Sequence, residues 1–227
     1  MRRTVMMVLV ALVGAALVGY VIYDTATVNQ KTQALLRAPG VRAATSDESA
    51  HQDEGVEAIP VAPDAFATYQ VDAAAPRLIT IESLGIRARV RPMGLNRDNT
   101  IQAPKNIYDA GWYTGSAAPG EAGAMFIDGH ASGATHLGLF GNLASLHIGD
   151  RVTIEKGDHT SLSYRVVHVE TVALEAVDMH RATEPFAGVE KGLNLMTCTG
   201  RWMNEGATLD HRVVVYTEQV TEQVPSR

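Results

Sequence analysis

The chain has 227 residues, a formal net charge of −6 and a sequence pI of about 5.7. This acidic balance disfavours nucleic acid as a partner, because binding to a phosphate backbone depends on clustered Lys and Arg. The chain has one cysteine, Cys198, so no intramolecular disulfide framework is possible.

The N-terminal segment is strongly apolar. Residues 5–23 carry no charge, with Arg2 and Arg3 before them and Asp24 after them. As a helix this run would rise about 28 Å, which is close to the thickness of a bilayer core. We therefore expect residues 1–24 to form a cytoplasmic N-terminus and a single membrane anchor, with the rest of the chain exported. A cleaved secretory signal is the alternative, which the length of the run disfavours.

The composition changes twice after this segment. Residues 25–75 are rich in Ala, Thr, Asp, Glu, Gln and Pro, and this composition predicts an extracellular linker. Residues 76–220 contain most of the remaining large apolar residues and are expected to form one folded domain, and residues 221–227 a loose tail.

Short apolar runs separated by turn residues characterise the folded domain. We predict strands over residues 77–86 (ending at a turn around Gly85), 87–90, 108–113, 124–128, 152–155, 161–172, 193–197 and 213–216. Residues 137–146 and 176–183 have helical spacing instead. The pattern predicts a mainly β domain, an antiparallel sandwich or barrel with short helices.

Cys198 occupies a distinctive place in this pattern. It follows the alternating run 193–197 and precedes a loop that contains Gly200, so we expect it at a strand end. Arg212 begins the next strand, and a single connecting loop would bring both side chains to one end of a sheet. A buried, inert thiol is about as common as a reactive one, but placement on a rigid strand end favours a nucleophile.

A cysteine nucleophile needs a proton-transfer partner and a group that stabilises developing negative charge. His130 is the preferred partner because it follows the apolar run 124–128 and Gly129, and His136 is its nearest rival. Arg201 is the alternative to Arg212, although its loop position would hold it less firmly. We expect neither a metal site nor a cofactor, since no cluster of ligands accompanies Asp128 and His130.

Three motifs in this order resemble the sortases, the membrane-anchored cysteine transpeptidases of mostly Gram-positive bacteria. They are Ile-Asp-Gly-His at 127–130, Leu-Met-Thr-Cys at 195–198 and Asp-His-Arg-Val-Val-Val-Tyr at 210–216. The resemblance covers about residues 76–218 and is closest to the class E and class F sortases. It implies an eight-stranded β-barrel. The sequence departs from the family pattern at Asn194, where a Thr is usual, and at Thr199, which follows the cysteine.

The resemblance also implies a chemistry. Cys198 would be the nucleophile, His130 the acid and base, and Arg212 the residue that orients the substrate or stabilises the oxyanion. The substrate would be an exported protein with a sorting signal similar to Leu-Pro-x-Thr-Gly, and the acceptor an amine of a cell-wall precursor or a pilin lysine. Thr197, Trp112 and Met196 are expected at the substrate-binding groove.

Other functions remain as alternatives at this stage. A cell-wall amidase would have its cysteine before its histidine, and an L,D-transpeptidase would show His-Gly-Cys close together, so the order of His130 and Cys198 disfavours both. A cysteine hydrolase with the same fold, or a membrane-tethered β module that binds the cell wall without chemistry, remains open.

Overall fold

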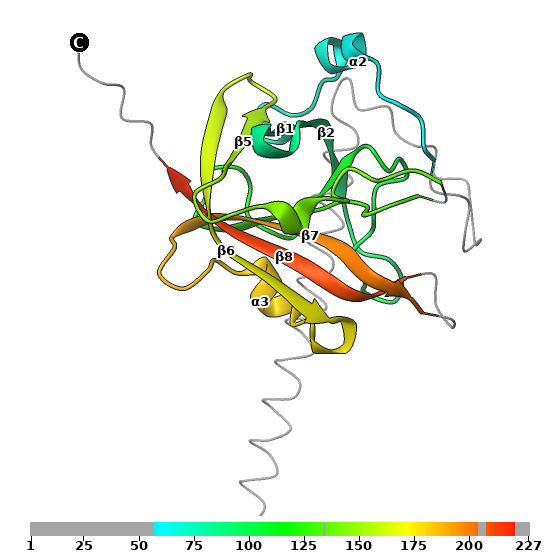
Figure 1. Cartoon of the computed structure of the whole chain (residues 1–227). Helices are drawn as coiled ribbons and strands as arrows, with labels where there is room; N and C mark the ends of the chain where they lie inside the picture. The colour runs from blue at the N-terminus through cyan, green and yellow to red at the C-terminus, as the bar shows by residue number, and fades with distance from the viewer. Residues whose placement is uncertain (1–56, 134, 204–207, 221–227) are drawn as a thin grey trace, which may run out of the picture.

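The computed structural model describes residues 57–133, 135–203 and 208–220 (Figure 1). The predicted membrane anchor, most of the predicted linker and the predicted tail lie outside these residues. Within the described part of the chain, no helix is both long and apolar enough to span a bilayer.

Eight strands close into one barrel, which confirms the predicted barrel architecture. The order around the barrel is β1-β2-β3-β4-β7-β8-β6-β5. The strands are β1 (Pro76–Ile81), β2 (Ile86–Met93), β3 (Ala110–Tyr113), β4 (Gly123–Asp128), β5 (Arg151–Lys156), β6 (Ser161–Ala173), β7 (Lys191–Trp202) and β8 (Leu209–Val220).

The barrel is mixed and not purely antiparallel as the sequence predicted. The pairs β2–β3 and β4–β7 are parallel. Parallel neighbours need a long crossover connection, and the chain supplies one by returning to β7 only after β5 and β6. The crossover places β7, which carries Cys198, beside β4, which leads to His130.

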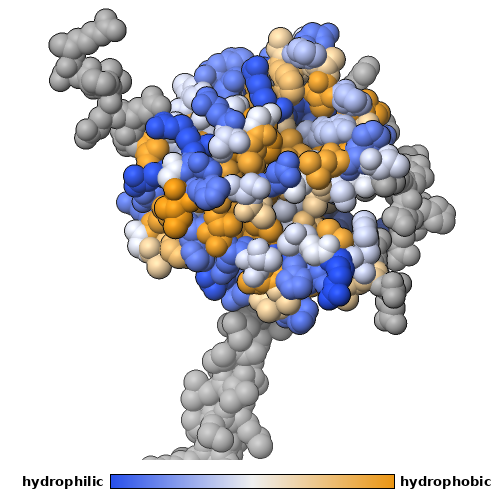
Figure 2. Space-filling model, in the orientation of Figure 1, coloured by the Kyte–Doolittle hydropathy of each residue, from blue (hydrophilic) through white to orange (hydrophobic). Residues whose placement is uncertain are grey.

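Alternating side chains fill the barrel interior, as expected for strands with one face buried. The largest members of this core include Ile79, Trp112, Phe140, Ile154, Tyr164, Leu195 and Val215. The outer face seen in Figure 2 instead carries apolar patches interspersed with polar residues. The core therefore fixes the strand register on which the site depends.

The helices of the described residues are short. The described residues contain α2 (Pro63–Thr68), α3 (Met179–Thr183) and the 3₁₀ turns η1 (Glu82–Leu84), η2 (Leu143–Ser145) and η3 (Leu174–Ala176). The helix predicted at 137–146 is therefore wrong apart from η2. Its backbone amides bond elsewhere, because Gly138 donates to the Ala131 carbonyl at 2.8 Å and Phe140 to the His130 carbonyl at 3.0 Å.

The folded unit begins earlier than the predicted boundary at residue 76. The Glu57 amide donates to the Lys105 carbonyl at 2.8 Å. The hydroxyl of Tyr69, which is buried, donates to the Val90 carbonyl at 2.7 Å. Residues 57–75, the last part of the predicted linker, are thus packed against the barrel, because Tyr69 contributes an aromatic anchor that the polar composition around it obscured.

Candidate active site

Cys198 and Arg212 lie directly opposite each other on β7 and β8. Side chains at such opposed positions share one face of the sheet, with Cβ atoms about 5 Å apart. Cys198 is not at the end of its strand as predicted, because β7 continues to Trp202. The register shifts between Thr199 and Trp202, where Gly200 has a φ of +94°.

Gly200 has a specific reason to be glycine. A Cβ at this position would lie 2.0 Å from Oδ1 of Asp210. The same oxygen accepts hydrogen bonds from the Arg201 amide at 2.8 Å and faces Nδ1 of His211 at 2.8 Å. These bonds hold the pKa of Asp210 below its usual value. The irregular tip of the hairpin is therefore stabilised just beyond Cys198.

Thr208 connects the thiol and the guanidinium. Its hydroxyl lies 4.0 Å from Sγ of Cys198 and accepts a hydrogen bond from Nη2 of Arg212 at 2.8 Å. Nη1 of Arg212 donates to the carbonyls of Leu209 and His211, both at 2.9 Å. The guanidinium is thus fixed beside a half-buried thiol. Sequence reasoning missed Thr208, because a hydroxyl in a loop carries no motif.

His130 is held by a main-chain acceptor. Its Nε2 lies 2.7 Å from the carbonyl oxygen of Pro104. A carbonyl only accepts hydrogen bonds, so Nε2 carries a hydrogen and Nδ1 is the nitrogen available for proton exchange. The hydroxyl of Thr197 donates to the Gly129 carbonyl at 2.8 Å and ties β7 to the segment that carries His130.

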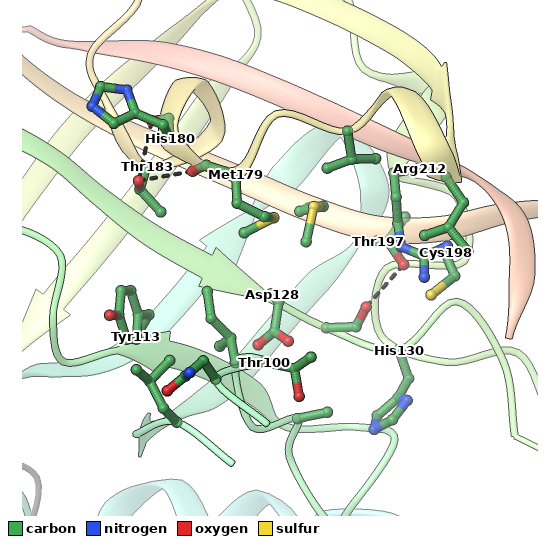
Figure 3. A pocket seen from close by; sticks show the side chains of 18 residues that line it. Thr100, Tyr113, Asp128, His130, Met179, His180, Thr183, Thr197, Cys198 and Arg212 are labelled. Atoms are coloured by element: carbon green, nitrogen blue, oxygen red, sulfur yellow. Dashed lines mark hydrogen bonds between the residues drawn. The ribbon is translucent and has the colours of Figure 1, made fainter. Parts of the chain in front are cut away.

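One cavity of about 710 Å³ brings His130, Cys198 and Arg212 together (Figure 3). Most of its other walls are apolar. They include Leu95, Ile101, Leu174, Val177, Met179 and Met196. The cavity has room for several residues of an extended peptide, with the three polar groups at one end.

The structure places only some of the other predicted site residues at the cavity. Thr197 and Met196 line the cavity. Trp112 lies in the barrel core instead, 2% exposed, where its Nε1 donates to the Ala117 carbonyl at 3.2 Å. The two rivals, His136 and Arg201, are exposed and are not among the residues that line the cavity.

Asn194, at the position where the sequence departs from the family motif, has a structural role. It is fully buried on β7, and its Nδ2 donates to the carbonyls of Ala182 at 2.9 Å and Glu184 at 2.7 Å. These bonds attach the end of α3 to the barrel. Because Met179 and Thr183 of α3 line the cavity, Asn194 holds one of its walls in place.

Asp128 is a site residue that sequence reasoning used only as part of a motif. It ends β4 and lines the same cavity as Thr197 and Cys198 (Figure 3). Loss of hydration raises the pKa of this carboxyl to about 8. The residue as a whole is half-buried, but Oδ1 itself is buried.

A protein-family model described as the sortase domain matches residues 79–220. The chain belongs to the sortase family. Members of this family are cysteine transpeptidases. The match covers all of β2 to β8 and ends with the last described residue of the chain. It includes the three residues that converge on the cavity.

Solved structures agree with this fold. The chain is similar to a lid mutant of sortase A from Corynebacterium diphtheriae, with 22% identity, a TM-score of 0.50, and coverage of 66% of this chain and 72% of that one. It is also similar to sortase C1 of Streptococcus agalactiae in complex with MTSET, with 20% identity, a TM-score of 0.50, and coverage of 69% and 74%. A search of curated proteins found no match.

Proposed function

We propose that this sortase is a membrane-anchored enzyme that cleaves a C-terminal sorting signal of exported proteins and transfers the acyl group to an amine. The convergence of Cys198, His130 and Arg212 in one cavity is the observation that carries the proposal. The signal resembles Leu-Pro-x-Thr-Gly, and the acceptor is an amine of a cell-wall precursor or a pilin lysine. The apolar run at residues 5–23 supports anchoring, with the catalytic domain outside the cell.

We propose a role for each group. The Cys198 thiolate attacks the carbonyl carbon of the scissile peptide bond, and Arg212 stabilises the oxyanion by charge-assisted hydrogen bonds. Nδ1 of protonated His130 then gives its proton to the departing amine as the C–N bond breaks, leaving a thioester on Cys198. The incoming amine loses a proton to His130, attacks the thioester and releases the thiolate.

The subclass is also a proposal. The motifs around His130, Cys198 and Arg212 support class E or class F. The solved structures reported above belong to classes A and C, so they do not bear on this distinction.

Mass spectrometry of the full chain in detergent micelles tests the proposed function. Incubation with pentapeptides similar to Leu-Pro-x-Thr-Gly should add an acyl mass to the peptide that contains Cys198. Adding an amine should release the joined product. His130→Asn should lower kcat by about 10²- to 10⁴-fold, and Cys198→Ala should abolish the adduct.

Two other outcomes identify the alternatives. An adduct that water resolves, with no joined product at any amine concentration, would indicate a hydrolase. A thiol that no peptide acylates, in a protein whose binding to the cell wall survives Cys198→Ala, would indicate a tethered binding module and contradict the transpeptidase.

A further inference from the structure

Asp128 lies on the floor of the cavity, between the two strands that flank β4. It pairs with Met196 of β7 on one side and with Gly111 of β3 on the other. Met196 precedes Cys198 by two residues on β7, which runs parallel to β4. The carboxyl is therefore displaced from the thiol by about 7 Å along the strand direction, the rise of two extended residues.

One oxygen of the carboxyl lies against the main chain of β3 at Gly111. A Cβ added to Gly111 would be 2.4 Å from Oδ1 of Asp128, so only glycine leaves room for it. Oδ1 is buried and has no hydrogen-bond partner. A buried oxygen without a partner costs free energy. Because Oδ1 lies against β3 and Asp128 lines the cavity, Oδ2 is the oxygen that a bound peptide can reach.

The threonine hydroxyls that line the cavity do not meet this need. The hydroxyls of three threonines that line the cavity donate to oxygens elsewhere in the protein. These bonds are Thr100 to Asp98 Oδ1 at 2.7 Å, Thr183 to the Met179 carbonyl at 2.9 Å and Thr197 to the Gly129 carbonyl at 2.8 Å. Asp128 thus presents an unused acceptor in a cavity whose walls are mostly apolar.

We propose that Asp128 is a specificity-determining residue that accepts a hydrogen bond from a donor-bearing side chain of the substrate peptide. This inference rests on the proposed function and names a preference of the same site. We assign the donor to a side chain because backbone N–H groups are common to all peptides and cannot produce a sequence preference. Amide and ammonium groups both supply this chemistry.

The offset along the strands indicates which substrate residue is recognised. The acyl half of the peptide stays bound through both steps, whereas the leaving half must depart. We therefore assign the cavity floor to the acyl half, and the recognised residue lies two or three positions before the one that contributes the scissile carbonyl.

The protonation of Asp128 is compatible with either donor. Burial raises its pKa to about 8, so at neutral pH the carboxyl is mostly neutral and pairs with a carboxamide as both donor and acceptor. An ammonium group would favour the ionised form. The other ionisable groups that share the cavity are Tyr113 on β3, Cys198 on β7, Arg212 on β8, His130 after β4 and His180 on α3.

Binding measurements test the assignment without requiring catalysis. Fluorescent peptides related to Leu-Pro-x-Thr-Gly carry Gln, Lys or Met at the second or third position before the Thr, and are titrated against the full-length Cys198→Ala protein. Met matches Gln in length but has no donor. We expect the Gln or Lys peptide to bind at least about tenfold tighter than the Met peptide at one of these positions.

Two additional variants test whether Asp128 causes the preference for a donor. In the Cys198→Ala background, Asp128→Leu should remove the preference, whereas Asp128→Asn, which keeps an acceptor oxygen, should retain it. Equal affinities for all peptides, no binding of any peptide, or a preference that survives Asp128→Leu would each overturn the proposal. The comparison of peptides on unsubstituted Asp128 holds even if a variant fails to fold.

Acylation of intact Cys198 by the same peptides separates this inference from the proposed function. Acylation without a donor preference would contradict only the role of Asp128. A donor preference in binding without acylation would contradict the transpeptidase and leave the recognition site standing.

Discussion

Two of the regions that line the cavity are held by different means. The β7–β8 hairpin places Cys198 opposite Arg212 through a continuous backbone ladder. The segment 174–184, which contains η3 and α3, forms another wall, and side-chain hydrogen bonds help to attach it. The two bonds from Asn194 and an exposed bond from Arg181 to Glu170 at 3.1 Å are among these attachments.

Because of this difference, we expect substitutions in the two regions to affect different quantities, the reaction rate and the fit of the substrate. Backbone hydrogen bonds fix the reacting groups whatever their side chains are, so substitutions at Cys198 or Arg212 should change rate and leave the fold intact. The wall depends on a few side-chain bonds, so substitutions there should change how the cavity fits a substrate. Local openings of such segments require less free energy than global unfolding.

Arg212→Lys is the strongest test of the hairpin side of this comparison. Lysine keeps the charge but cannot reproduce the fork that contacts Thr208 and two carbonyls. We expect kcat/KM to fall by about 10²- to 10³-fold with little change in melting temperature. Steady-state kinetics and calorimetry measure both quantities.

Arg201→Lys is the matched control, because its side chain is 93% exposed at the hairpin tip. It should behave like the unsubstituted protein. An Arg212→Lys enzyme that retains kcat/KM within threefold would show that the guanidinium does not stabilise the transition state.

Asp128→Asn tests the floor that lies between the two regions. The folded carboxyl keeps its proton up to a pKa of about 8, whereas the unfolded one releases it near 3.8. With respect to this carboxyl, the free energy of unfolding is therefore greatest below pH 3.8. It falls as the pH rises to about 8, by up to about 1.4 kcal/mol per pH unit. Asparagine does not titrate, so the variant should gain about 2.7 kcal/mol over the unsubstituted protein between pH 5 and 7.

Urea unfolding at both pH values measures this difference. The histidines and Arg212 in the cavity are common to both proteins, so their own titration largely cancels. A stability difference that stays constant between pH 5 and 7 would show that the carboxyl is ionised in the folded protein.

Sequence patterns predicted much of the β structure. Alternation of apolar residues located the strands, and the chain order of His130, Cys198 and Arg212 selected three groups that the structure brings to one cavity. These inferences succeeded because a strand imposes a two-residue period on its own sequence. Trp112 shows the limit of the approach, since an aromatic residue has the same pattern in a core as in a groove.

The failures share a physical cause, which is dependence on distant partners. The helix expected at 137–146 did not form, because Gly138 and Phe140 donate to the segment that follows His130. The strand at Cys198 continues because β8 pairs with it beyond a polar, Gly-containing sequence. The acceptor for His130 is the carbonyl of Pro104, and a carbonyl leaves no trace in a sequence.

Asn194→Leu tests the wall, with a smaller expected effect on kcat/KM than Arg212→Lys. Leucine has the same branching and number of side-chain heavy atoms, although its methyl groups are larger, and it cannot donate to the Ala182 and Glu184 carbonyls. Two lost bonds cost about 2 kcal/mol, and removal of the buried Oδ1, which has no partner, offsets about half of this. We therefore expect a net loss of about 1 kcal/mol, a KM raised about fivefold and a kcat within twofold, because the wall loosens while the hairpin stays fixed.

Hydrogen exchange provides the deciding readout for this variant. Amides of residues 179–184 should exchange faster in Asn194→Leu, while those of β7 and β8 keep their protection. Arg181→Met, which removes an exposed bond to Glu170, serves as the matched control and should change KM by less than twofold. A fall in kcat with an unchanged KM would mean that Asn194 acts on the hairpin, and the two regions would not be independent.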